Sequence, residues 1–138
     1  MRSRDTRTGS VLEKMILPAL DAGGYEYDLR VKVGRRLGLG AHIVDVVAKK
    51  DGRTFLVSLK WQQVSGTAEQ KIPFEVICLA SAVDETDHEM AYLVLGGEGW
   101  KLRGFYTSGD LAKHLSNPNK VEILTLESFV AKANRGAL

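Results

Sequence analysis

The stretch AHIVDVVAKK (residues 41–50), the dipeptide Asp51-Gly52 and the stretch RTFLVSLKWQ (residues 53–62) decide the fold of this chain. Both stretches are rich in β-branched and apolar residues, which is typical of strands. An Asp-Gly pair between two such runs favours a two-residue type I′ turn. The three segments therefore predict an antiparallel hairpin in which Lys50 faces Arg53 and Asp45 faces Ser58.

Polar side chains gather at one place on this mostly apolar hairpin. Because side chains alternate along a strand, Ser58, Lys60 and Gln62 share one face, and Asp45 is expected opposite Ser58. A carboxylate, a hydroxyl, an ammonium and an amide would then lie in one small patch. Taken singly, Asp45 and Lys60 are ordinary surface charges of strands, and it is their expected proximity that favours a functional site.

Length and composition set broad limits. A chain of 138 residues with 44% hydrophobic and 26% charged residues predicts one globular domain over residues 1–138. No apolar run is long enough to span a bilayer, and the basic start MRSRDTRTGS lacks the apolar region of a signal peptide. The only cysteine, Cys78, allows no intramolecular disulfide and no zinc cluster. We therefore expect an intracellular, cytoplasmic protein that does not bind membranes.

Charge is unevenly distributed along the chain. Residues 30–60 contain eight basic and two acidic residues, a net charge of +6, and the remaining residues carry −4 of the total of +2. A positive half that includes the polar patch is what binding to a phosphate backbone would produce, although a solvated hairpin face would give the same bias. The residues expected to contact DNA are Arg30, Lys32, Arg35, Arg36, Lys49 and Arg53.

The other elements can be placed coarsely. Ser10 and Glu13 fit a capping box at the start of a helix that ends at Gly23-Gly24, and Pro18 predicts either a kink in this helix or a separate last turn. Further elements are a strand at 25–33, a helix at 67–83 whose regular part begins near Pro73, a strand at 90–96, a helix at 108–115, a strand at 121–124 and a helix at 126–134. This order predicts an α/β domain with a mixed central sheet flanked by helices.

The order of elements and the hairpin motif resemble the PD-(D/E)XK nuclease superfamily. Its restriction-endonuclease-like core has the order αβββαβ, and the matching segments here are residues 9–24 with Glu13, residues 42–48 with Asp45 and residues 56–63 with Lys60. The stretch SGTAEQKIPFEV (residues 65–76) is similar to the helix start that follows the catalytic hairpin in restriction and phage enzymes. A glutamate in the first helix also resembles the Holliday junction resolvases.

The resemblance implies a role for each residue of the patch. Asp45 would be the principal ligand of Mg²⁺ (or Mn²⁺), the backbone carbonyl of Leu59 would supply another oxygen, and Glu13 would bind directly or through water. Lys60 would orient the attacking water or stabilise the charge of the transition state. Gln62 would hold a phosphate oxygen or the water.

Ser58 departs from the family pattern, which has Asp or Glu at this place. A serine hydroxyl is a weaker ligand for a hard cation, and three explanations compete. Another carboxylate could replace the missing one, with Glu69 the nearest candidate in sequence. The enzyme could work with one cation held by Asp45 and Glu13. Or the chain could be a catalytically inactive DNA-binding relative.

The resemblance implies a metal-dependent DNA endonuclease that acts as a homodimer on duplex or branched DNA. A branched-DNA resolvase and a site-specific endonuclease both fit, and a small stand-alone nuclease of this kind could be phage-encoded. The alternatives are a nuclease-fold DNA-binding module without activity and a structural protein with no salt-dependent affinity for DNA.

Overall fold

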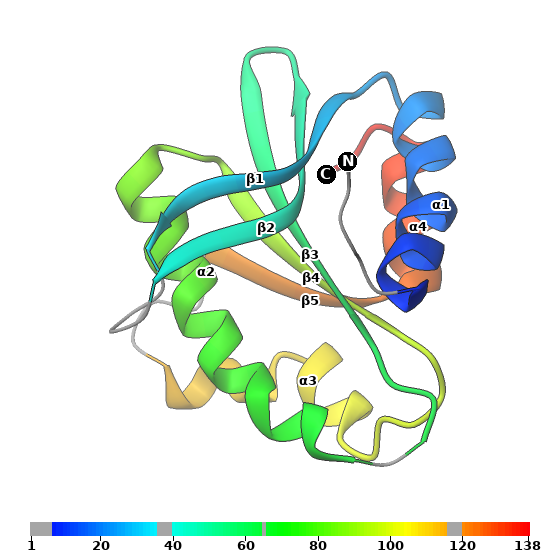
Figure 1. Ribbon diagram of the computed structural model, residues 1–138, viewed down its shortest axis with the longest axis vertical. Coiled ribbons are helices and arrows are strands. Elements are labelled where there is room, and N and C mark those ends of the chain that lie inside the picture. Colours follow the sequence, from blue (N-terminus) through cyan, green and yellow to red (C-terminus); the bar gives the residue numbers. More distant parts are fainter. Residues whose placement is uncertain (1–6, 36–39, 65, 116–119) are drawn as a thin grey trace.

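Five strands form one mixed sheet in the order β1-β2-β3-β4-β5 (Figure 1). The first three strands are antiparallel neighbours, and β3, β4 and β5 run parallel. The computed structural model describes residues 7–35, 40–64, 66–115 and 120–138. The strands are β1 (Glu26–Arg35), β2 (Ala41–Lys50), β3 (Arg53–Trp61), β4 (Met90–Gly96) and β5 (Val121–Thr125). The expected α/β fold with a mixed central sheet is therefore confirmed.

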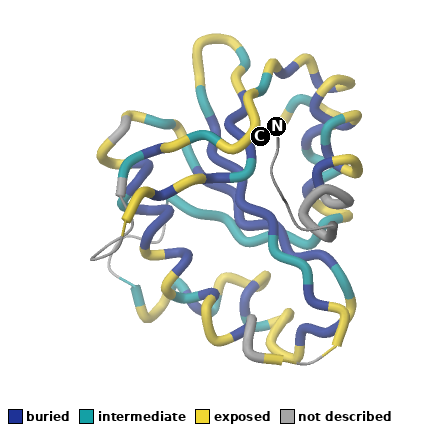
Figure 2. Tube along the Cα trace, viewed as in Figure 1, coloured by how far each residue is buried: buried dark blue, intermediate teal, exposed yellow. Residues whose placement is uncertain are grey.

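Helices cover both faces of the sheet (Figure 1). On one face α1 (Arg7–Ala22) packs against α4 (Leu126–Asn134). The other face is covered by η1 (Thr67–Lys71), α2 (Ile72–Thr86), α3 (Arg103–Thr107) and η2 (Asp110–His114). Two apolar cores result, one on each face, and Figure 2 shows that the central strands between them are the most buried part of the molecule. None of the described helices is long and apolar enough to cross a membrane.

The predicted hairpin is present with its predicted turn. Asp51 and Gly52 both have positive φ angles, 55° and 78°, as a type I′ turn requires. Lys50 pairs with Arg53, and the register continues without a shift to the pair Val46–Val57. Local turn chemistry therefore fixed the alignment of β2 and β3 from the turn to the pair Val46–Val57.

Two predicted helices differ from those in the structure. The helix α1 begins at Arg7, so Ser10 lies inside it and is not its N-cap. Pro18 lies inside this one continuous helix. Residues 108–115, predicted to form a helix, contain the short 3-10 helix η2, and α3 ends just before them at Thr107. The α2 helix begins at Ile72, with Pro73 in its first turn, as expected.

At Arg30 of β1 and Asp45 of β2, the side chains of each strand switch from one face of the sheet to the other. Along this part of the chain, the odd-numbered residues before Arg30, Tyr25 and Tyr27, pack in the α1/α4 core, whereas those after it, Val31 and Val33, pack in the α2 core. Arg30 has a φ of 53°, a left-handed conformation that is uncommon for a non-glycine residue. The β1–β2 register steps over the pair Arg30–Asp45. Asp45 therefore lies at an interruption in the sheet.

Candidate active site

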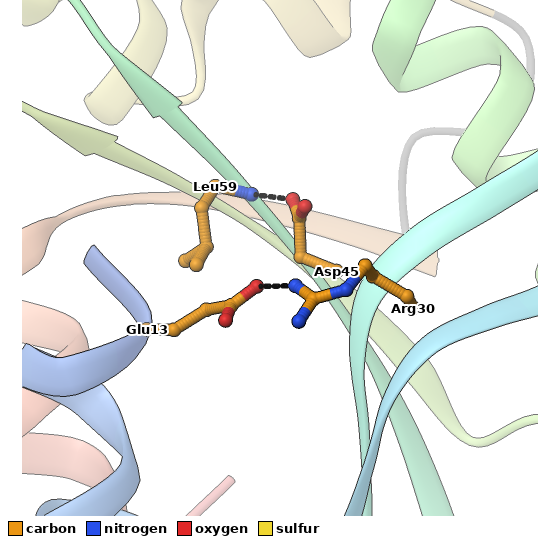
Figure 3. A network of polar contacts seen from close by, with 4 residues as sticks. All are labelled: Glu13, Arg30, Asp45 and Leu59. Atoms are coloured by element: carbon orange, nitrogen blue, oxygen red, sulfur yellow. Dashed lines mark hydrogen bonds and ion pairs between the residues drawn. The ribbon is translucent and has the colours of Figure 1, made fainter. Parts of the chain in front are cut away.

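Asp45 lies where the β2–β3 ladder stops. Val46–Val57 is the last backbone pair between β2 and β3. Beyond this pair the Leu59 N–H donates to a side chain of β2, because Oδ2 of Asp45 accepts its hydrogen bond at 2.7 Å (Figure 3). In an antiparallel ladder the N–H and C=O of one residue are directed to the same neighbour. The carbonyl of Leu59 is therefore directed to the side of the strand on which Asp45 lies.

The electrostatic surroundings of Asp45 disfavour its charged form. Burial raises the pKa of Asp45, and repulsion from Glu75 adds to this rise. The hydrogen bond from Leu59, the ammonium of Lys60 and the guanidinium of Arg30 act in the opposite direction without cancelling it. Two carboxylates thus lie close enough to repel each other in a partly desolvated place, which is an arrangement that a bound cation would relieve.

Ser58 contacts a carboxylate that comes from α2. Its Oγ donates a hydrogen bond of 3.1 Å to Oε2 of Glu75, and both residues are buried, with 3% and 4% of their surface exposed. The Nε2 of His42 lies 3.8 Å from the same oxygen. The expected pair Asp45–Ser58 is not part of the ladder. Ser58 instead binds a glutamate at the place where the family pattern has an acid.

Glu13 and Arg30 form an ion pair beside Asp45. Arg30 Nη1 lies 2.5 Å from Oε2 of Glu13, and Figure 3 shows the Arg30 side chain reaching from β1 to α1, next to Asp45. Glu13 is 7% exposed. The structure therefore brings the first-helix glutamate to the edge of the site through an arginine that was expected to contact DNA.

Glu69 lies in a different environment. Its carboxylate accepts hydrogen bonds from the backbone N–H groups of Lys101 and Leu102, at 2.8 and 2.6 Å, and from the Gln62 amide at 3.4 Å. Burial alone would raise the pKa of Glu69, but these hydrogen bonds outweigh it and hold the pKa below its ordinary value. Glu69 thus anchors the segment that leads into α3, and it is Glu75 that reaches Ser58.

The remaining residues of the predicted patch are placed by β3. Lys60 pairs with Leu95 of β4 and is partly exposed, and its charge acts on Asp45. The amide of Gln62 donates to the Gly99 carbonyl at 2.8 Å as well as to Glu69. Gln62 therefore ties β3 to the loop after β4.

The predicted DNA contacts fall into separate groups. Lys32 is exposed on β1, and Lys49 and Arg53 are exposed at the turn end of the β2–β3 hairpin. Arg53 lies 3.9 Å from Glu89 in an exposed ion pair. Arg35 is the last residue of β1, and Arg36 lies outside the described residues.

Sequence reasoning missed Glu75 and His42. A signal existed for Glu75, because it lies on the apolar stripe of α2 beside Ile72, Val76 and Leu79, all of which are buried. An acid on such a stripe is uncommon and needs a partner. His42 was recognised as a strand residue, but nothing local indicated that α2 would bring a carboxylate to it.

The donor set suits a hard divalent cation. Among the described residues, no group of three or more His, Cys, Asp or Glu side chains could by itself hold a metal ion. Mg²⁺, however, is usually bound by one or two carboxylates with water and substrate phosphate completing its shell. Asp45, Glu75 and the carbonyl of Leu59 offer such oxygens, and burial together with the nearby charge of Glu75 raises the pKa of Asp45.

A helix, a three-strand meander, a second helix and a parallel strand, with carboxylates and a lysine around the second and third strands, define the class of restriction-endonuclease-like folds. The chain belongs to the PD-(D/E)XK nuclease superfamily, whose domain matches residues 4–137. The family resemblance inferred from the hairpin is therefore confirmed. No curated protein matches the chain.

Solved structures with low sequence identity share the fold. A protein of unknown function, AF1548, has 14% identity and a TM-score of 0.56 over 86% of this chain and 56% of its own, so this chain spans just over half of it. A FdxN element excision controlling factor protein from Anabaena variabilis has 19% identity and a TM-score of 0.55, covering 87% and 94% of the two chains. A XisH family protein from Nostoc punctiforme has 16% identity and a TM-score of 0.51, covering 86% and 94%.

Proposed function

We propose that this protein is a Mg²⁺-dependent endonuclease that hydrolyses phosphodiester bonds of DNA. The observation that carries the proposal is the contact between Glu75 and Ser58, beside Asp45 and Lys60. It supplies a carboxylate from α2 where the family pattern has an acid on β3. In this proposal the acid is supplied by position 75 of α2 in place of position 58 of β3, so Ser58 does not indicate that the active site has been lost.

Asp45, Glu75 and the carbonyl of Leu59 would hold the cation, with Mn²⁺ able to replace Mg²⁺. When bound there, the cation would supply positive charge against the scissile phosphate and against the negative charge that develops in the transition state. Asp45 is already oriented for this role, because the Leu59 N–H fixes one of its oxygens and leaves the carboxylate at the open end of the ladder.

Lys60 is the residue that acts on the reacting groups. In the reaction a water oxygen attacks phosphorus, the bond from phosphorus to the leaving sugar oxygen breaks, and that oxygen takes up a proton. The Lys60 ammonium can orient the water and stabilise the phosphoryl oxygens as their charge increases. Its partial exposure at the carboxyl end of β3 lets it meet a substrate that arrives from solvent.

Two further groups support the site without touching the substrate. Glu13 holds Arg30 next to Asp45, which favours the ionised carboxylate that a cation requires. Gln62 and Glu69 fix the loop after β4 against β3. Of the acids expected to bind metal, we therefore assign Glu13 and Glu69 to supporting roles.

Exposed basic residues would contact the DNA backbone. Lys32, Lys49 and Arg53 are exposed on the three-strand meander, and phosphate contacts of this kind give affinity without sequence preference. Cleavage of both strands of a duplex, or of two strands at a branch, requires two active sites, and we propose a symmetric homodimer for this purpose.

The test is cleavage of supercoiled plasmid, linear duplex and a four-way junction with Mg²⁺, Mn²⁺ or EDTA. Wild type should cut with either metal and not with EDTA, and Asp45→Asn should not cut. The preferred substrate separates a resolvase from a site-specific endonuclease. Salt-dependent binding without cutting by wild type would overturn the proposal in favour of an inactive DNA-binding module.

A further inference from the structure

His42 is a buried histidine without a hydrogen bond. It is 1% exposed, and within the described part of the chain neither Nδ1 nor Nε2 has a hydrogen-bond partner. A buried polar group left unpaired costs about 1–3 kcal/mol. An apolar side chain at this position of β2 would avoid that cost, so packing alone does not account for a histidine here.

A carboxylate of the proposed site lies close to His42. Its Nε2 lies 3.8 Å from Oε2 of Glu75, the same oxygen that accepts the hydrogen bond from Ser58 Oγ. A hydrogen bond from an N–H to oxygen is typically about 2.7–3.2 Å long. A movement of the Glu75 carboxylate by less than about 1 Å would therefore complete the bond, and such contacts often tighten only when a site is loaded.

We propose that His42 is a positioning residue that, together with Ser58, fixes the direction of the Glu75 carboxylate. Donors from two neighbouring strands, Nε2–H of His42 on β2 and Oγ–H of Ser58 on β3, converge on one oxygen of a glutamate from α2. This rests on the proposed function, in which Glu75 is a ligand. Outer partners of this kind orient a ligand, and their loss typically lowers metal affinity or activity by about 10–100-fold.

The chain offers a test that distinguishes the two ring nitrogens. Glutamine places its amide nitrogen near the position of Nε2, asparagine places its amide nitrogen near that of Nδ1, and leucine donates no hydrogen bond. The variants His42→Gln, His42→Asn and His42→Leu are compared with wild type by calorimetric titration with Mn²⁺. The Mn²⁺ concentration for half-maximal cleavage is measured in parallel.

We expect His42→Leu and His42→Asn to weaken Mn²⁺ binding about 10-fold or more, and His42→Gln to stay within about 3-fold of wild type. The cleavage midpoints should shift by the same factors, and saturating Mn²⁺ should recover most of the rate. The control is His88→Leu, which removes a histidine that is hydrogen-bonded to Thr54 at 2.6 Å and should leave Mn²⁺ binding unchanged.

Equal binding by wild type and His42→Leu, or equal losses in His42→Gln and His42→Asn, would overturn the role of His42 while leaving the proposed function intact. If wild type itself neither binds Mn²⁺ nor cuts, the proposed function fails and the role of His42 falls with it. Thermal melts identify any variant that does not fold. If His42→Leu is such a variant, the comparison of glutamine with asparagine decides.

Discussion

Two buried glutamates, one in η1 and one in the first turn of α2, have opposite surroundings. Glu69 in η1 accepts two backbone hydrogen bonds and one from an amide, and its pKa is held low. Glu75 in α2 meets a serine hydroxyl and a distant histidine, and its charge acts on Asp45. One carboxylate is fully used by the fold, whereas the other stands beside a second negative charge.

The difference teaches how to separate a structural acid from a candidate ligand. A carboxylate that several N–H groups surround stabilises the fold and gains nothing from a cation. A carboxylate such as Asp45, whose pKa is raised by burial and by a second carboxylate nearby, is destabilised in its charged form, and such arrangements are concentrated at functional sites. Distance along the sequence favoured Glu69 as the replacement acid, and the bonding pattern favours Glu75.

The sharpest way to break this comparison is to neutralise each glutamate in turn. Glu75→Gln should lower Mg²⁺-dependent cleavage by about 10²–10³-fold, because the cation loses a charged oxygen near the phosphate. At temperatures where the variant is folded, Glu69→Gln should cleave at a rate within about 3-fold of wild type. Rates are measured at saturating DNA, and equal losses in both variants would contradict the assignment.

The stability of Glu69→Gln sharpens the other half of the comparison. Because hydrogen bonds to a charged group contribute about 1.5–3 kcal/mol, the variant should unfold more easily by about 1–2 kcal/mol at pH 7. The folded pKa lies below the ordinary value of 4.5, so this contribution is present above pH 4.5 and is lost as the pH falls further. Urea unfolding at pH 7 and pH 3 measures the difference, and a larger loss at pH 3 would be inconsistent with this account.

Asp45→Asn should change stability in the opposite direction. The folded pKa of Asp45 lies above the ordinary value of 3.8, so ionisation destabilises the fold, and the cost is present at neutral pH and absent well below pH 3.8. Asparagine still accepts the hydrogen bond from Leu59. In EDTA the variant should therefore melt at a higher temperature than wild type at pH 7, with no gain at pH 3. Addition of Mg²⁺ should raise the melting temperature of wild type and should not raise that of Asp45→Asn.

The smallest effect is expected at the hairpin end. Arg53 and Glu89 are about half exposed and 3.9 Å apart, so Arg53→Ala should change stability by less than about 0.5 kcal/mol. If Arg53 contacts a phosphate, the slope of log affinity against log salt should become shallower by about 1, with a uniform loss across DNA sequences. Binding titrations at several salt concentrations decide, and an unchanged slope removes Arg53 from the interface.

Much of the hairpin could be predicted because its signals are local. Asp51-Gly52 has the positive φ angles that its residue types indicate, and the register follows from the turn. The helix at 126–134 and the strand at 90–96 coincide with α4 and β4. The face change at Arg30 was not foreseen, because nothing in its residue type indicates a left-handed backbone.

The site could be predicted only in part, because half of it comes from another element. Asp45, Ser58 and Lys60 lie on two strands that a short turn joins, so their proximity follows from sequence. Glu75 and His42 meet only after α2 packs on the sheet, and no local pattern specifies that contact. Glu75 and His42 are both buried polar residues, and a polar residue within an apolar stretch was the one sequence signal that pointed to them.

The most direct test of the central claim is to move the carboxylate back to β3. Cleavage is measured for Glu75→Ser, for Ser58→Glu with Glu75→Ser, and for that double variant with Asp45→Asn added. Glu75→Ser should lose about 10²–10³-fold in rate, the double variant should return to within about 10-fold of wild type, and the triple variant should be inactive. A double variant no better than Glu75→Ser, or full activity of Glu75→Ser, would contradict the claim that Glu75 supplies the acid missing at Ser58.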